Sequence, residues 1–71
     1  MWYERLKEIC GEEVVVHASD PVFSITGFLS YSEHSRKFTV NGTDYISFPA
    51  AYVDDIGLGL GIRKVIHLTL R

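Results

Sequence analysis

Residues 22–31 of the chain read VFSITGFLSY, ten residues in which apolar and polar side chains alternate. A period of two places successive side chains on opposite faces of an extended strand. One face collects Phe23, Ile25, Gly27, Leu29 and Tyr31. A glycine on that apolar face lets the strand bend sharply or lets another backbone come close. The stretch therefore predicts a long, bent strand in a small curved sheet.

The residues before this strand predict a helix and a first strand. Residues 2–10 carry apolar side chains at helical spacing, and Gly11 follows where a left-handed residue commonly ends a helix. A helix this short is marginal in water, so we expect its apolar side to dock on the sheet. The β-branched run VVV within residues 13–18 predicts a strand that ends at the turn-like Ser19-Asp20-Pro21.

A hairpin is expected after the long strand. Two extended stretches, residues 37–40 and 44–48, flank Asn41-Gly42, which is the strongest short-range hairpin signal. Pro49 cannot donate to a neighbouring strand, so we expect the second stretch to end there. Residues 50–56 favour a turn that leads into a short strand.

The pairing within this hairpin poses a problem. A two-residue turn pairs Phe38 with Tyr45 and Val40 with Thr43. Ile46 and Phe48 then lie on the opposite face, so that both faces are apolar. Three explanations stay open: a bulge shifts the register, the helix and core cover both faces, or a neighbouring subunit covers one of them.

The end of the chain combines a glycine-rich connector with another alternating stretch. Glycines alternate with leucines over residues 57–61, which predicts a flexible connector. Residues 62–71 then predict a final strand, with one apolar face formed by Ile62, Ile66, Leu68 and Leu70. A final strand left unpaired at an edge would invite association with another chain.

Composition sets the class of protein. The 71 residues are 46% apolar and 23% charged, which predicts one globular domain over residues 1–71. The formal charge of −2 disfavours overall attraction to nucleic acid or an anionic membrane but allows a local patch. No apolar stretch is long enough to cross a membrane, and Cys10 stands alone, which favours a reducing compartment. We therefore expect a cytoplasmic protein.

The order of elements predicts a mainly β fold, in which an N-terminal helix is followed by a strongly bent, five-stranded antiparallel barrel of SH3-like shape. This order also resembles the Sm-like small barrels, a group that includes the Sm, LSm and bacterial Hfq proteins. The resemblance covers roughly residues 3–56. It rests on a "G-x-x-V-x-V" pattern at Gly11, Val14 and Val16, and on a "G-x-L" pattern at Gly27-Phe28-Leu29.

Some positions of the chain depart from the family pattern. Glu33 falls at the family's acidic position. Lys37, however, stands where Sm and LSm proteins carry an Asn that helps to hold a nucleic-acid base. The second family motif is absent from residues 45–51, and Ile62-Arg63-Lys64 comes too late and lacks its glycine. The resemblance implies a barrel, a ring of subunits joined through edge strands, and single-stranded RNA as a ligand.

Four of the seven positive charges stand in two dipeptides, Arg36-Lys37 and Arg63-Lys64. If the barrel brings both to one rim, they form a basic patch beside Tyr31, His34 and Tyr52. Phosphate contacts together with aromatic stacking are what single-stranded RNA or DNA binding needs. We expect the nucleic-acid-binding residues to be Arg36, Lys37, Arg63, Lys64, His34 and Tyr31.

No catalytic, metal or cofactor site is predicted. Cys10 lies on the apolar stripe of the helix, where a free cysteine behaves as a small hydrophobic residue. We therefore do not expect it to act as a nucleophile that His17 activates as a base. The three histidines, His17, His34 and His67, show no ligand-type spacing. The glycines of residues 57–61 precede a strand rather than the helix of a phosphate loop, and adjacent carboxylates on a strand point to opposite faces.

Two functions remain in view. The first is a non-enzymatic, self-associating Sm-like barrel that binds single-stranded RNA or DNA at the basic rim. The second is a small SH3-like adaptor that binds a protein partner through an apolar face near Phe48, Tyr52 and residues 58–60, with no nucleic acid involved. Neither requires a membrane or a cofactor.

Overall fold

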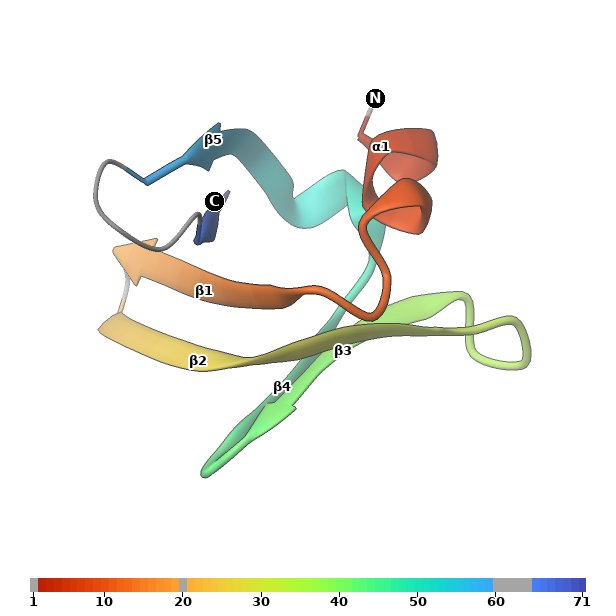
Figure 1. Ribbon diagram of the computed structural model, residues 1–71, viewed down its shortest axis with the longest axis horizontal. Helices are drawn as coiled ribbons and strands as arrows, with labels where there is room; N and C mark the ends of the chain where they lie inside the picture. Colours follow the sequence, from red (N-terminus) through yellow and green to blue (C-terminus); the bar gives the residue numbers. More distant parts are fainter. Residues whose placement is uncertain (1, 20, 60–64) are drawn as a thin grey trace.

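A computed structural model describes residues 2–19, 21–59 and 65–71 (Figure 1). The chain is mainly β, with one short N-terminal helix, as the sequence predicts. The elements are α1 (Tyr3–Glu8), β1 (Glu13–Ser19), β2 (Val22–Ser32), β3 (Lys37–Gly42), β4 (Tyr45–Phe48), the 3-10 helix η1 (Ala50–Tyr52), β5 (Val53–Leu58) and β6 (Ile66–Leu70).

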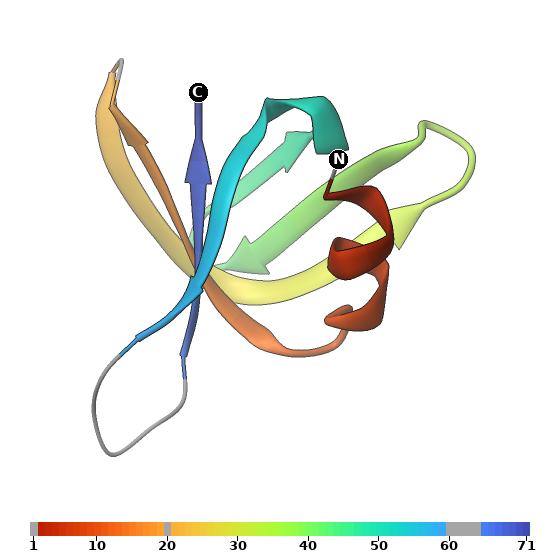
Figure 2. The same cartoon turned by 90° about the horizontal axis from the view of Figure 1, so that it is seen from above.

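The six strands form one sheet in the order β4-β3-β2-β1-β6-β5. Every neighbouring pair is antiparallel except β1 and β6, which run parallel, with Val14 opposite Ile66. Figure 2 shows the sheet curling around the core, with β2 crossing the molecule and α1 lying next to η1. Within the described residues the edges β4 and β5 do not pair, so a closed five-stranded antiparallel barrel is not confirmed.

The helix docks on the sheet through its apolar side. Leu6 is fully buried and Ile9 nearly so, whereas Trp2 and Cys10 pack against the core from its margin. The helix is shorter than the predicted residues 2–10, because α1 ends at Glu8 with Ile9 as its C-cap. Gly11, with a φ of +91°, lies in the turn that follows. The backbone N–H of Gly11 donates to the carbonyl of Leu29 over 2.7 Å, which fastens the end of the helix to β2.

One apolar core lies inside the curl of the sheet. Its buried members are Leu6, Ile9, Val14, Val16, Leu29, Phe38, Val40, Phe48, Val53, Leu68 and Leu70. β1, β3 and β6 each supply two alternate residues to it. The inward residues of β2 alternate along the strand, which confirms the expected faces of that strand. Gly27 is a point of close approach in this sheet, because a Cβ there would lie 2.6 Å from the backbone carbonyl of Asn41.

The predicted hairpin register is wrong. Asn41 and Gly42 belong to β3, and the chain turns instead at residues 43–44. Phe38 pairs with Phe48, and Val40 pairs with Ile46, so the apolar residues of β4 share the core face. Of the three explanations, a shifted register is the one observed, and no second apolar face of β4 needs covering.

The glycine of the Asn41-Gly42 pair serves the sheet rather than a turn. Gly42 is opposite Gly27 on β2, and a Cβ at residue 42 would collide with the carbonyl oxygen of Thr26. Backbones that approach this closely require glycine, so β3 extends through a residue pair that is typical of turns.

The last part of the chain follows the prediction in some respects and departs from it in others. Pro49 ends β4, and η1 leads into β5. Residues 57 and 58 are strand rather than connector, and the remainder of the predicted connector and the start of the final strand, residues 60–64, lie outside the described residues. The final strand is not at an edge, because β6 lies between β1 and β5.

Candidate functional site

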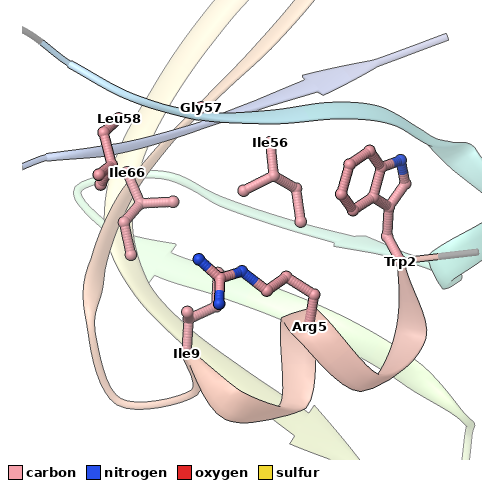
Figure 3. A pocket seen from close by; sticks show the side chains of 7 residues that line it. All are labelled: Trp2, Arg5, Ile9, Ile56, Gly57, Leu58 and Ile66. Carbon is pink, nitrogen blue, oxygen red and sulfur yellow. The ribbon is translucent and has the colours of Figure 1, made fainter.

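A hollow of the described surface lies between α1 and the strands β5 and β6 (Figure 3). Its volume is about 390 Å³. It is lined by Trp2, Arg5, Ile9, Ile56, Gly57, Leu58 and Ile66. The helix supplies one wall and the apolar residues of the two strands supply the other, so the pocket forms because the short helix covers only part of the core face.

Arg5 is the one charged side chain among these lining residues. Figure 3 shows it reaching from the helix into the space between α1 and β5. Its guanidinium lies 3.4 Å from the carboxylate of Glu8, and both side chains are well exposed. An exposed ion pair of this kind contributes little, so Arg5 is able to exchange Glu8 for an acidic group of a ligand.

Apolar side chains extend the pocket toward solvent. Leu58 is 67% exposed at the rim and lies on β5, an edge strand. Tyr52, 57% exposed, lies in η1 immediately before β5. A second hollow of about 270 Å³ lies beside η1 and is also lined by Trp2, which therefore borders both spaces. Of the predicted apolar face, Tyr52 and Leu58 are exposed but lie at opposite ends of β5, Phe48 is buried in the core, and residue 60 lies outside the described residues.

The predicted nucleic-acid-binding residues that the structure describes lie at or beside the turn between β2 and β3. His34 and Arg36 are exposed in the turn, Lys37 begins β3, and Tyr31 is half-buried near the end of β2. Arg36 has a left-handed φ of +56°. Arg63 and Lys64 fall outside the described residues, so the structure does not test whether both dipeptides share one rim.

Tyr31 is held by neighbours that the sequence analysis missed. Its hydroxyl hydrogen-bonds that of Tyr3 at 3.3 Å, and this bond is the main reason that the pKa of Tyr31 is raised. The ammonium of Lys7 lies 4.7 Å from the Tyr31 ring centroid and 3.9 Å from a carboxylate oxygen of Glu33. Tyr3 and Lys7 stand four residues apart on the helix, which is a spacing that could have identified them as neighbours.

The residues considered for catalysis do not form a nucleophilic site. Cys10 is half-buried, burial raises the pKa of its thiol, and its Sγ contacts the carbonyl of Leu6 at 3.5 Å. A raised pKa keeps the sulfur in its unreactive thiol form. Asp54 instead pairs with Arg71 at 4.0 Å on the surface.

The histidines depart from the sequence-based view in one respect. His17 and His67 lie side by side, with Nε2 of the first 2.7 Å from Nδ1 of the second. No spacing in the sequence indicates this contact, because it depends on the parallel pairing of β1 with β6. Across the described ranges, no group of three or more His, Cys, Asp or Glu side chains is arranged to hold a metal ion.

Among the helices that the structure describes, none is long and apolar enough to cross a membrane. No protein-family model matches the chain, and neither a curated protein nor a solved structure matches it.

Proposed function

We propose that this chain is a non-enzymatic binding module that recognises an extended peptide segment of a partner protein. The observation that carries the proposal is the pocket between α1 and β5, which combines an apolar wall with the guanidinium of Arg5. A ligand that fits both features has an apolar side chain next to a carboxylate, either an Asp or Glu side chain or a free C-terminus.

The free edge of the sheet supports an extended peptide over a compact ligand. Among the strands that the structure describes, β5 pairs with β6 alone, so its other edge carries no strand partner there. An edge strand offers unpaired backbone N–H and C=O groups to which a peptide can add as a further strand. Backbone bonds to β5 supply affinity in this arrangement, and the pocket beside Leu58 supplies specificity.

Selection from a display library of random decapeptides tests the proposal, followed by fluorescence titration of the selected peptides. Trp2 is the only tryptophan and borders the pocket, so its emission reports occupancy directly. We expect selected peptides to carry a carboxylate beside a large apolar residue and to shift the Trp2 emission. Arg5→Gln should weaken binding by about tenfold or more, because it removes a charged partner.

Lys7→Gln is the matched control. It removes a cation from the same helix, but Lys7 does not line the pocket. Its binding should equal that of the unmodified chain at moderate salt. A selection that yields no common sequence, or peptides that bind Arg5→Gln as well as the unmodified chain, would overturn the proposal.

A second candidate is binding of single-stranded RNA or DNA, favoured by the arrangement of Tyr3, Tyr31 and Lys7 beside Arg36 and Lys37. The aromatic pair meets edge to face at 5.7 Å, and Lys7 lies over both rings. We rank it second because the Tyr31 ring already contacts Lys7 and Phe38, so that stacking on a nucleic-acid base would have to compete with these contacts. Labelled single-stranded oligonucleotides of uridine and thymidine test it. Affinity should fall with salt, and the double change of Arg36 and Lys37 to Gln should flatten that dependence.

Self-association and an Sm-like or SH3-like barrel stay proposals. The curl of the sheet and the N-terminal helix support a partly open barrel of this general shape. The two sequence arguments for a ring no longer hold, since β4 has one apolar face and β6 is internal. Association would instead join the edges β4 and β5 of different copies. The lone Cys10 continues to favour an intracellular location.

A further inference from the structure

Two histidines meet on the face of the sheet that points away from the core. His17 of β1 and His67 of β6 lie on neighbouring parallel strands, and Val15 is the residue directly opposite His67. Their ring planes differ by 11° and their centroids are 5.0 Å apart. This separation is close to the 2.7 Å between the facing nitrogens plus one nitrogen-to-centroid radius for each ring. The rings therefore lie end to end in nearly one plane.

This arrangement directs two ring nitrogens at one point. In the hydrogen-bonded pair one facing nitrogen carries a proton and the other accepts it. If each neutral ring instead carries its proton on the outer nitrogen, both facing nitrogens present lone pairs. The Oγ of Ser24 lies 3.5 Å from Nδ1 of His17, where it can accept that outer proton. A partner on the outer nitrogen is what holds a metal-binding imidazole in its correct tautomer.

We propose that His17 and His67 together bind one divalent transition-metal ion, through Nε2 of His17 and Nδ1 of His67. Water completes the coordination, because no third His, Cys, Asp or Glu side chain of the described residues joins the two histidines in a possible metal site. Imidazole ligands suit Cu²⁺, Ni²⁺ and Zn²⁺, and of these Cu²⁺ should bind most tightly. The tautomeric change moves one proton between nitrogens of the same ring, so two neutral rings bind the ion without net proton release.

The geometry needs the two rings to separate and to tilt, because they now point straight at each other. Two nitrogens that are each about 2.0–2.1 Å from a tetrahedral zinc ion stand roughly 3.3 Å apart. The facing nitrogens must therefore separate by roughly 0.6 Å, and each ring must tilt by roughly 35° so that its lone pair meets the ion rather than the other nitrogen. Rotation about the side-chain torsions of the two histidines provides both changes. Both rings are half-buried on paired strands, so the backbone that carries them is fixed.

Gly59 controls the position of the second ring. A Cβ at residue 59 would lie 2.6 Å from Nε2 and 2.9 Å from Cδ2 of His67. The absence of a side chain at this glycine therefore lets the His67 ring lie where it meets His17. Gly59→Ala should displace the ring without removing either ligand, whereas nothing lies within 4 Å of a Cβ built at Gly57.

Titration of the metal-free chain with zinc sulfate, followed by NMR of the histidine ring nitrogens, tests the proposal. We expect the signals of His17 Nε2 and His67 Nδ1 to move together with one zinc ion per chain, while those of His34 stay in place. His17→Gln and His67→Gln should each weaken binding by about tenfold or more, since one of two protein ligands is lost. His34→Gln should bind zinc like the unmodified chain.

The glycine variants separate a metal site from damage to the fold. Gly59→Ala should weaken zinc binding and Gly57→Ala should not, with circular dichroism showing that both are folded. The proposal fails if zinc moves all three histidines alike, if the His17 and His67 signals do not respond, or if binding survives removal of either ring. It stands or falls independently of peptide binding, because neither histidine lines the pocket.

Discussion

Gly27 shows how a single missing side chain shapes this sheet. A methyl group there would lie 2.6 Å from both the carbonyl carbon and the oxygen of Asn41, which belong to backbone and cannot swing aside. Gly27→Ala should lower the free energy of unfolding by about 2–3 kcal/mol, as overpacking does in other tight interiors. Urea denaturation measures the change. Gly57→Ala, with open space around its Cβ, should differ from the unmodified chain by less than about 1 kcal/mol. Equal effects at the two positions would contradict the close contact.

Cys10 gives the chain a weakness at alkaline pH. Burial raises the pKa of its thiol in the folded state above the ordinary value of 9.0, and the nearby charge of Lys7 opposes this only in part. The unfolded state therefore ionises first, so this contribution to stability is complete below pH 9 and is lost as the pH rises through the folded-state pKa. Stability measured between pH 8 and pH 10.5 should fall less steeply for Cys10→Ala than for the unmodified chain. Parallel curves would show that the thiol titrates alike in both states.

At the scale of elements, the β3–β4 hairpin offers a direct test of register. Phe48 is buried opposite Phe38, while Tyr45 is 67% exposed at the far end of the same strand. Phe48→Ala should destabilise the chain by about 3–4 kcal/mol, the usual cost of emptying a buried aromatic position. Tyr45→Ala should cost under about 1 kcal/mol. Thermal denaturation of the two variants distinguishes the registers. If Tyr45 rather than Phe48 paired with Phe38, Tyr45→Ala would be the more destabilising change.

The hairpin also shows where sequence reasoning fails for this chain. Local signals identified the helix, the glycine in the turn that follows it, the alternating faces of β2 and the turn before β5, because each depends on nearby residues. The Asn41-Gly42 pair led to a wrong prediction of the turn position. In a sequence, a glycine that a close backbone contact requires cannot be distinguished from a glycine that a turn requires. Only the long-range pairing of Gly42 with Gly27 distinguishes the two cases.

The candidate sites also differ in whether nearby residues or long-range contacts form them. The sequence identified Tyr31, His34, Arg36 and Lys37 as neighbours because they surround one turn. The pocket joins α1 to β5 and β6, and the histidine pair joins β1 to β6, so both depend on contacts between the two ends of the chain. Sequence periodicity carries no information on such pairings. Arg5 differs from other exposed cations of the helix only because Ile56, Leu58 and Ile66 form the opposite wall of its pocket.

For the molecule as a whole, the order of strands predicts where protection from hydrogen exchange is greatest. β1 is bonded on both sides, to β2 and to β6, whereas β4 and β5 each have one edge without a strand partner in the described part of the chain. Amides of β1 that are hydrogen-bonded to β2 or β6 should exchange at least about tenfold more slowly than the amides on the outer edges of β4 and β5. Exchange measured by NMR at two protein concentrations checks this. Added protection of β4 and β5 at the higher concentration would indicate edge-to-edge association.

The parallel pairing of β1 with β6 also has a consequence for synthesis. A chain grows from its N-terminus, so Val14 and Val16 leave the ribosome long before Ile66 and Leu68, the residues opposite them. Until residues 66–70 emerge, β1 has a partner on one side only, and the unpaired backbone groups of its other edge are open to other nascent chains. Slow translation of the intervening segment would lengthen that exposure, so codon choice between residues 20 and 65 bears on how much of this protein a cell recovers in folded form.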